Sequence, residues 1–306
     1  MMDKVTFTGQ GPECSQLVQG YWRLAEWGMS AQERLTFIQQ HVELGVSTVD
    51  HADIYGMHQC ERLFGEALAL KPELKQKIQI VTKCDINLTG SIFPQRKVKH
   101  YDTSAEHIIH SVENSLQALG VDKLDVLLIH RPDALLDADE VALCFERLQQ
   151  QGKVVHFGVS NFTPSQFSLL QSRLDQPLVT NQVEINPLNF DVVHDGTLDQ
   201  LQQLRVRPMA WSCLAGGELS RSSNNHLTER SKRVVDELYA VAQELGAKNI
   251  EQVIYAWIRR LPSNPIPILG SGKIARVNNA VDALKYELSR EQWYRIWTAS
   301  MGQEVP

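Results

Sequence analysis

The feature that most constrains this chain's fold is a regular alternation of short apolar segments with longer segments of helical periodicity. The apolar segments are rich in β-branched residues and leucine, which favour strands. The strand candidates are residues 17–22, 46–50, 77–82, 124–129, 154–159, 179–185, 208–212 and 266–269. Helical patterns separate them at residues 30–44, 59–70, 104–119, 138–151, 197–204, 228–245 and 249–260, with another beginning at Pro164. Repeated strand–helix units imply a parallel sheet.

Two architectures accommodate such a sheet, an open doubly wound sheet and a closed (β/α)8 barrel. Eight strand candidates in 306 residues favour the barrel, which commonly forms as one domain of this length. Residues 4–16 can form a hairpin before the first strand, with residues 8–12 as its turn. Helical patterns at 275–285 and 290–299 follow the last strand. We therefore expect one (β/α)8 TIM barrel domain over residues 1–306, with an N-terminal hairpin and extra C-terminal helices.

The overall composition excludes several classes of partner. A net charge of -6 argues against nucleic acid or an anionic membrane as the main partner. No apolar stretch approaches the ~20 residues of a membrane span, and the N-terminus has no secretory signal. Five scattered cysteines without a CxxC pair are typical of a reduced compartment. We therefore expect a cytoplasmic protein.

Four chemically active side chains follow three consecutive strand candidates. Asp50 ends the second strand, Tyr55 lies five residues later, and Lys83 and His130 end the next two strands. In a (β/α)8 barrel these strand ends share one mouth, where active sites lie. Each residue alone has an ordinary interpretation as a helix cap, a packed ring, a solvated strand end or a structural histidine. Together they favour a site, because a buried ammonium at Lys83 would need Asp50 as a partner.

This combination predicts proton chemistry at Tyr55. A cation beside the phenol would lower its pKa from about 10 by favouring the phenolate. A phenol tuned in this way can give or take a proton near neutral pH. His130 could then orient a substrate oxygen.

The loop after the last strand candidate is the second informative stretch. It resembles a Walker A loop, but Pro267 and Ile274 occupy positions that this motif reserves for glycine and for serine or threonine. No strand is followed by GxGxxG, so the Rossmann fingerprint is also missing. What remains is a glycine turn opening a helix, where barrels often bind phosphate. Nearby polar side chains are Ser271, Lys273 and Arg276, which could equally be solvated.

The other strand ends are polar or planar. Ser160 and Asn161 end the fifth strand, Gln182 lies in the sixth, and Trp211 ends the seventh. Their amides and hydroxyl could bind a carboxamide. The indole of Trp211 could stack on a ring or simply pack in the barrel.

These motifs resemble the aldo-keto reductase superfamily, and the similarity runs from Leu17 to about Leu284. The matching stretches are D-x-A-x-x-Y-G at 50–56, C-E-x-x-x-G at 60–65, Lys83, L-I-H-R-P-D at 128–133, G-V-S-N-F at 158–162 and I-x-G-S-x-K at 268–273. Within the superfamily the sequence looks most like the bacterial YdhF-type and potassium-channel β-subunit-like branches.

The resemblance implies an NADPH-dependent reductase that transfers hydride to an aldehyde or ketone, a small-molecule carbonyl substrate. Tyr55 would be the general acid, Lys83 held by Asp50 would lower the pKa of Tyr55, and His130 would place the carbonyl. Cofactor contacts would come from Ser160, Asn161 and Gln182 on the carboxamide, Trp211 on the nicotinamide ring, and Ser271, Lys273 and Arg276 on the 2′-phosphate. Ser212, Leu214, Gly216, Gly270 and Asn279 complete the implied cofactor site.

The sequence departs from the family pattern at two places. His51 replaces the usual threonine or serine after the aspartate, and Ala280 stands where the family often has an adenine-binding asparagine. Specificity should lie in the loops 23–29, 84–102 and 213–227.

Two other functions compete with the reductase. The first is an NADPH-binding sensor or regulatory subunit with little turnover, which the resemblance also permits. The second is a metal-dependent barrel hydrolase, prompted by His51 and Asp53. Such hydrolases need several histidine and carboxylate ligands at one mouth, whereas these strand ends supply Lys83, Asn161 and Gln182. We therefore expect no metal.

Overall fold

Parallel strands close into an eight-stranded barrel in the computed structural model, which describes residues 3–9, 11–220 and 227–306. Around the barrel the order is β3, β4, β5, β8, β9, β10, β11 and β12, and β12 pairs back to β3. Their bounds are β3 (Val18–Gly20), β4 (Thr48–Asp50), β5 (Gln79–Cys84), β8 (Leu124–Ile129), β9 (Val154–Ser160), β10 (Asn181–Glu184), β11 (Met209–Trp211) and β12 (Ile266–Leu269). The closed barrel confirms the predicted fold class.

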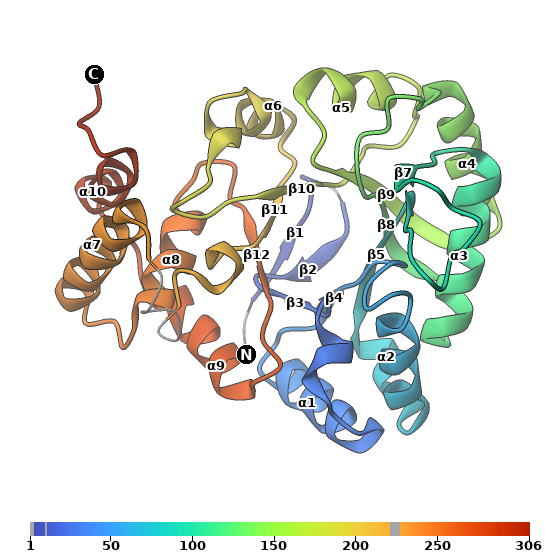
Figure 1. Ribbon diagram of the computed structural model, residues 1–306, viewed down its shortest axis with the longest axis horizontal. Coiled ribbons are helices and arrows are strands. Elements are labelled where there is room, and N and C mark those ends of the chain that lie inside the picture. Colours follow the sequence, from blue (N-terminus) through green and yellow to red (C-terminus); the bar gives the residue numbers. More distant parts are fainter. Residues whose placement is uncertain (1–2, 10, 221–226) are drawn as a thin grey trace.

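Helices surround the barrel at the positions that the sequence pattern predicts (Figure 1). They are α1 (Ala31–Glu43), α2 (Cys60–Ala69), α3 (Ala105–Leu119), α4 (Ala138–Gln150), α5 (Pro164–Gln171), α6 (Thr197–Leu204), α7 (Glu229–Leu245), α8 (Ile250–Arg259), α9 (Ile274–Asp282) and α10 (Arg290–Met301). Side-chain caps fix where several of these helices begin, as in the capping box of Ser30 with Glu33 at the start of α1. The helix expected at 275–285 ends at Asp282 and continues as a 3₁₀ turn, η5 (Ala283–Lys285).

The N-terminal hairpin packs against the inside of the barrel. Its strands are β1 (Lys4–Thr6) and β2 (Glu13–Ser15), which pair antiparallel as predicted. Phe7 is buried with barrel residues such as Val18, and its carbonyl accepts the N–H of Arg207. In the expected turn at 8–12, residue 10 lies outside the described residues.

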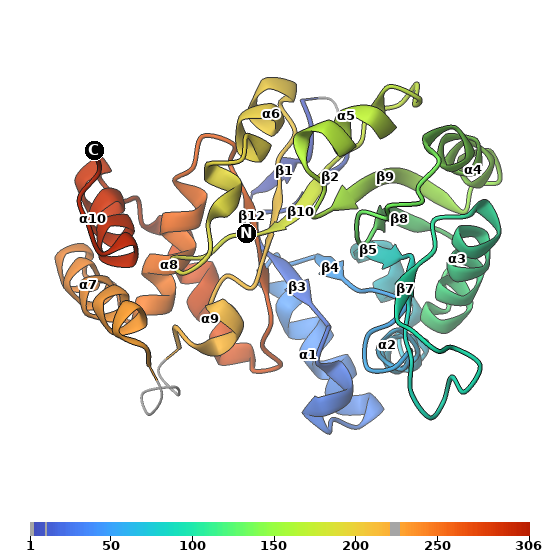
Figure 2. The same ribbon diagram turned by 45° about the horizontal axis from the view of Figure 1, so that its top comes forward.

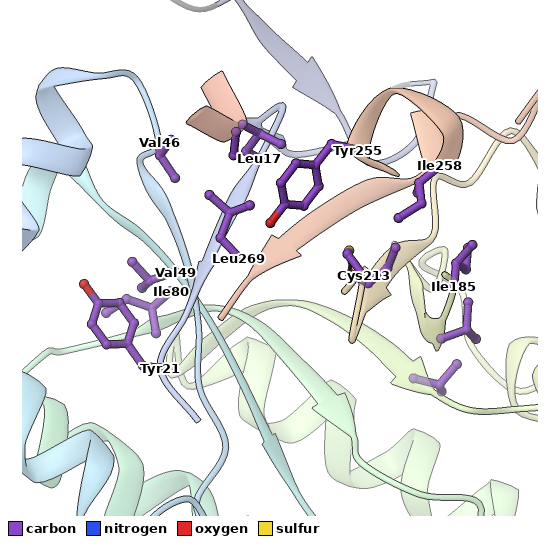
Figure 3. Packing of buried hydrophobic residues seen from close by; sticks show 14 of the residues in the cluster. Leu17, Tyr21, Val46, Val49, Ile80, Ile185, Cys213, Tyr255, Ile258 and Leu269 are labelled. Carbon is purple, nitrogen blue, oxygen red and sulfur yellow. Dashed lines mark hydrogen bonds between the residues drawn. The ribbon is translucent and has the colours of Figure 1, made fainter. Parts of the chain in front are cut away.

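Strand periodicity divides the core into two parts and sets which side chains face the barrel interior. Alternate residues point to opposite faces of a strand. Leu17, Val49 and Ile80 belong to the large cluster between strands and helices (Figure 3), whereas Val18 and Val81 belong to the cluster inside the barrel. Residues two positions beyond an inward-facing residue also face inward. The same periodicity therefore directs polar residues at the carboxyl ends of the strands into the barrel mouth.

The long loops contain structure that the sequence pattern did not predict. Residues 84–102 include a short hairpin of β6 (Ile86–Asn87) and β7 (His100–Tyr101). Strands of two residues are too short to show a period of two, so their pattern is invisible. The described chain also forms 3₁₀ turns at η1 (Leu24–Trp27), η2 (Pro72–Lys77), η3 (Asp191–Val193) and η4 (Ala215–Gly217). In the predicted loop 213–227, residues 221–226 lie outside the described residues.

A glycine contact holds α2 close to α3. A Cβ added at Gly65 would lie 2.1 Å from the backbone oxygen of Ala118, a separation no real side chain tolerates. We expect Gly65→Ala to lower the free energy of unfolding by about 1–3 kcal/mol, because the two helices must move apart. Urea denaturation measures this change. Gly9→Ala is the control, because its Cβ would meet no atom within 4 Å. Equal stability of both variants would show that α3 adjusts without cost.

Candidate active site

The centre of the barrel mouth is the fully buried ammonium of Lys83. Its Nζ donates to both carboxylate oxygens of Asp50 at 2.8 and 2.9 Å, and to the backbone oxygen of His51 at 2.6 Å. The hydroxyl of Tyr55 accepts from the same nitrogen at 3.0 Å. The chain thus surrounds one buried cation with an anion, a carbonyl and a phenol. This arrangement offsets the cost of burying the charge.

Strand register and one short loop create this arrangement. In the β4–β5 pairing Asp50 lies opposite Val81, so Lys83, two residues further along β5, faces the same interior. The chain then turns after Asp50, and the N–H of Asp53 donates to the backbone oxygen of Lys83 at 3.0 Å. The N–H of Tyr55 donates to Ala52 at 3.1 Å. These bonds hold the phenol over the end of β5.

His130 follows β8 and lies edge-on to Tyr55, with ring centroids 5.9 Å apart and an interplanar angle of 79°. Burial and the nearby cations Lys83 and Arg131 hold the pKa of His130 well below its usual range. The imidazole is therefore neutral at pH 7. Its Nδ1 has no hydrogen-bond partner among the described residues. A neutral imidazole can donate a hydrogen bond to a substrate oxygen without adding a charge.

The pKa of Tyr55 shifts in the opposite direction from the one that the sequence suggested. Burial raises this pKa above 10, the charge of Lys83 lowers it, and the charge of Asp50 raises it again. Lys83 does lower the pKa of Tyr55 as expected, but the expected net lowering is wrong, because a cation that is itself paired with a carboxylate does not offset the loss of water around the phenol. Tyr55 is consequently a phenol, with a proton to give, at neutral pH.

Lys83 keeps its charge despite complete burial. Burial lowers its pKa, but the carboxylate of Asp50 and the hydroxyl of Tyr55 more than offset this, so the pKa rises above 10.5. The side-chain amide of Gln182 also reaches Asp50, with Nε2 at 2.7 Å from Oδ1. Asp50 therefore links the ammonium to the amide of Gln182 on the opposite side of the barrel mouth.

The polar residues of β9, β10 and β11 form a connected row. Ser160 Oγ donates to the backbone oxygen of Gln182 at 2.8 Å and accepts from Asn161 Nδ2 at 2.8 Å. The indole Nε1 of Trp211 donates to Asn161 Oδ1 at 3.1 Å. Asn161 adopts a left-handed backbone with φ of 61°, a conformation that asparagine tolerates better than most residues. These contacts fix the orientation of the Trp211 ring beside the row.

The glycine turn after β12 presents its cations to solvent. Gly270 and Ser271 lead into α9, and Ser271 Oγ accepts the N–H of Lys273 at 3.2 Å. Lys273 and Arg276 are exposed, and neither forms an ion pair within the described chain. The backbone oxygen of Asn279, one helical turn further, accepts from Gln252 Nε2 at 3.2 Å.

The loop after β11 contributes the remaining residues of the implied cofactor site. Ser212 has a left-handed backbone with φ of 51°, and its carbonyl accepts from Asn186 Nδ2 at 3.1 Å. Leu214 packs against the core, and Gly216 in η4 has a positive φ of 66°. Strand β11 therefore ends in a tight turn beside Trp211.

Several groups near the site were not identified from the sequence as part of it. The guanidinium of Arg131 lies 5.7 Å from the ring centroid of Trp211, a contact that its position directly after His130 could have suggested. Glu61 accepts from Thr82 Oγ1 at 2.5 Å and from Ser115 Oγ at 2.9 Å. It therefore ties α2 to the outer face of β5. The available signal was the position of Glu61 in the C-E-x-x-x-G stretch at 60–65.

Asp53 gives a testable pH dependence. Burial raises the pKa of its carboxyl from 3.8 to about 7, although the hydrogen bond from Ser111 lowers it. Between about pH 4 and pH 7 the folded protein therefore holds a proton that the unfolded chain has released. The free energy of unfolding must fall as pH rises through this window. We expect Asp53→Asn to become more stable relative to the parent from about pH 5 to about pH 8.

Urea denaturation at the two pH values measures this difference, and Asp122→Asn, at an exposed position, is the control. A stability difference between Asp53→Asn and the parent that did not change with pH would contradict a raised pKa.

Two broader features of the described chain bear on function. None of its helices is long and apolar enough to cross a membrane. Within the same residues, no cluster of three or more histidine, cysteine, aspartate or glutamate side chains is arranged to hold a metal ion. His51, which prompted the metal-dependent hydrolase alternative, is fully buried and stacks on Tyr21 with ring centroids 4.9 Å apart.

Comparison with known proteins identifies the family. Residues 16–300 match the model of the aldo/keto reductase family. The chain is 56% identical over 306 residues to the oxidoreductase YdhF of Escherichia coli, with both chains covered completely. It is 40% identical over 297 residues to a 6-dehydroglucose reductase of Agrobacterium fabrum, covering 96% of each chain.

A solved structure with the same fold is an aldo/keto reductase from Klebsiella pneumoniae, in complex with NADP and acetate. The TM-score is 0.75 at 23% identity, with 95% of this chain and 94% of that chain covered. The family match over nearly the whole length and the two long alignments lead to one conclusion: the chain belongs to the aldo/keto reductase family, a family of oxidoreductases.

Proposed function

We propose that this protein is an NADPH-dependent carbonyl reductase in which Tyr55 is the general acid. The observation that carries the proposal is the contact of 3.0 Å between Lys83 Nζ and Tyr55 Oη, with Asp50 behind the ammonium. A phenol held at a buried cation can lose a proton to a developing alkoxide, because the cation stabilises the phenolate that remains.

Each residue of the group has a distinct task. The chemistry that NADPH would supply here, when bound, is a hydride for the carbonyl carbon. Tyr55 Oη gives its proton to the carbonyl oxygen, and Lys83 stabilises the resulting negative charge on the phenol. Asp50 keeps Lys83 charged and in place. His130, neutral and edge-on to Tyr55, donates a hydrogen bond that positions the substrate oxygen. In the reverse direction the Tyr55 phenolate would accept the alcohol proton.

The residues around the mouth suit a nicotinamide dinucleotide phosphate. Trp211 offers an indole face, with its ring held by Asn161. Ser160, Asn161 and Gln182 supply amide and hydroxyl groups next to it. In the turn that follows Trp211, Ser212, Leu214 and Gly216 would border the diphosphate, and Gly270, after β12, would allow close approach of the backbone. The Klebsiella relative was solved with NADP, which supports this choice of cofactor.

The preference for NADPH would come from the start of α9. Lys273 and Arg276 are exposed cations without ion-pair partners in the described chain, and Ser271 adds a hydroxyl. We expect Arg276→Ala to weaken NADPH binding about tenfold while leaving NADH binding nearly unchanged, because only NADPH carries the 2′-phosphate. Fluorescence titration with both nucleotides measures this. Arg290→Ala, exposed at the start of α10, is the control. Equal losses for both nucleotides would place the phosphate elsewhere.

A carbonyl panel tests the proposed reaction. The purified protein is mixed with NADPH or NADH and a range of aldehydes and ketones, and absorbance of the reduced nucleotide is followed. The panel includes polyhydroxylated aldehydes, because the Agrobacterium relative is named a 6-dehydroglucose reductase. Carbonyl-dependent oxidation of NADPH supports the proposal. Tight NADPH binding without turnover across the panel would instead support a nucleotide-binding sensor or regulatory subunit.

A further inference from the structure

Two cations beside the barrel mouth, Arg131 and Lys99, have no role in the proposed reaction and no counter-ion in the described chain. Arg131 directly follows His130, and its guanidinium lies 5.7 Å from the ring centroid of Trp211. Arg131 is partly buried, whereas Lys99 is exposed. A guanidinium that has lost part of its water and has no partner in the described chain is well suited to bind an anion.

The backbone around Arg131 is fixed by a buried carboxyl group. The N–H of Arg131 donates to Asp85 Oδ2 at 2.9 Å, and the carbonyl of Asp85 accepts the N–H of Asp102 at 2.8 Å. Asp85 therefore connects the end of β5 to the end of β8 and to the hairpin of β6 and β7. Lys99 directly precedes β7, and Figure 1 and Figure 2 both show β7 beside α3. Both cations thus belong to segments that are tied to the carboxyl ends of the barrel strands.

Both cations lie close to the side chains that would meet the substrate oxygen. The charge of Arg131 lowers the pKa of Tyr55 and of His130, and the charge of Lys99 also lowers the pKa of His130. Such effects weaken with distance, so the two charges lie near these rings. In the proposed reaction Tyr55 and His130 both contact the carbonyl oxygen. A substrate in that position can therefore extend toward Arg131 and Lys99.

The carboxylates around Arg131 have other partners. Glu184 on β10 accepts from Asn186 Nδ2 at 3.0 Å and from Asn189 Nδ2 at 2.9 Å. Burial raises the pKa of Glu184, and the charge of Arg131 only partly offsets this. The nearest oxygen of Asp85 accepts the backbone N–H of Arg131 and does not pair with its guanidinium. The protein itself therefore leaves the positive charge of Arg131 for a ligand to neutralise.

We propose that the carbonyl substrate carries a carboxylate and that Arg131 recognises it, with Lys99 as a second cation for the same group. The planar guanidinium can donate two parallel hydrogen bonds to a carboxylate. The substrate class is thus an oxo acid, an aldehyde or ketone with a carboxylate a few bonds from its carbonyl group. This inference rests on the proposed reductase function and names the substrate of the same site.

Carboxybenzaldehydes and the corresponding formylbenzamides make matched pairs of substrates, nearly identical in shape but different in charge. The ortho, meta and para isomers hold the carboxylate at different distances from the aldehyde. Succinic semialdehyde and its amide form a narrower pair. Steady-state oxidation of NADPH gives kcat/KM for each compound. In at least one pair the acid is expected to exceed its amide by about tenfold or more, because hydrogen bonds between charged groups are stronger than neutral ones.

Two variants assign this preference to the cations. Arg131→Gln should reduce the ratio of kcat/KM for acid over amide to about threefold or less, because glutamine keeps donors but not the charge. Lys99→Gln should lower the ratio about threefold, since exposed charges contribute less. Arg147→Gln on α4 and Lys97→Gln make the same charge changes at exposed positions and should keep the parent ratio. Weaker NADPH binding by Arg131→Gln, measured by fluorescence, would assign the guanidinium to the cofactor and overturn the inference.

Binding without turnover separates this inference from the proposed function. Calorimetric titration of the NADP+-saturated protein uses benzoate and benzamide as probes. Benzoate should bind about tenfold more tightly, and Arg131→Gln should lose this preference. That result, with no turnover of any carbonyl, would contradict the reductase function and leave the anion site standing. The inference is overturned if no acid exceeds its amide, if Arg131→Gln keeps the preference, or if benzoate binds no better than benzamide.

Discussion

Replacing Tyr55 by phenylalanine is expected to reduce NADPH-dependent carbonyl turnover by about 100-fold to 10 000-fold while leaving NADPH affinity unchanged. A positioned proton donor contributes a factor of this size, and the change removes only the donor atom. Lys83 Nζ keeps its bonds to Asp50 and to the His51 carbonyl, so the buried cation stays paired. The ring of phenylalanine also preserves the contact with His130.

The measurement uses steady-state rates on the best substrate of the carbonyl panel, together with fluorescence titration of NADPH. Tyr239→Phe is the matched control, because Tyr239 is exposed on α7 and should show parent activity. Full activity in Tyr55→Phe would refute Tyr55 as the general acid. Loss of NADPH binding together with activity would show that the phenol supports the cofactor site.

Most of the fold could be predicted from local sequence patterns, namely apolar segments for strands and capping residues for helix ends. Every strand of the barrel overlaps a predicted apolar segment, because strands buried on both faces are largely hydrophobic, and only β5 and β9 extend past the predicted ends, to Cys84 and Ser160. Helix ends could also be predicted from their caps, such as Ser30 and Gly120. The hairpin of β6 and β7 could not be predicted. Each strand has only two residues, too few to form a pattern, and the paired residues lie more than ten positions apart.

The site was less predictable in its energetics than in its location. Asp50 and Lys83 end neighbouring parallel strands, so their meeting at one mouth could be predicted from the sequence, whereas the register that turns both side chains inward could not. The balance between burial and charge at Tyr55 depends on how much water the folded loops exclude, and no sequence pattern reports that. The link from Gln182 to Asp50 crosses the barrel mouth between residues 132 positions apart and has no local signature either.

Changing Asp50 and Lys83 first singly and then together should separate their role in stability from their role in activity. We expect the double variant to recover stability but not turnover. Asp50→Asn leaves a fully buried ammonium without its counter-ion. We expect a loss of about 3–5 kcal/mol in the free energy of unfolding, as for other buried pairs broken on one side. Lys83→Met should cost less, because Gln182 Nε2 still donates to the Asp50 carboxylate.

The double variant Asp50→Asn, Lys83→Met removes both charges and keeps similar volumes. Its stability should recover most of the loss of Asp50→Asn, since a neutral pair in this position has no desolvation penalty to offset. Its carbonyl turnover should remain at least about 100-fold below the parent, because nothing stabilises the Tyr55 phenolate. Urea denaturation and steady-state rates measure the two quantities on the same preparations.

An exposed pair provides the control for this cycle. Lys248 and Asp282 lie 3.0 Å apart with largely solvated side chains, so Lys248→Met with Asp282→Asn should change neither stability nor turnover measurably. Recovery of both stability and turnover in the buried double variant would mean that the reaction does not need the charge of Lys83 either. Recovery of stability alone separates the two roles, because it shows that the folded barrel does not need this ion pair but the reaction does.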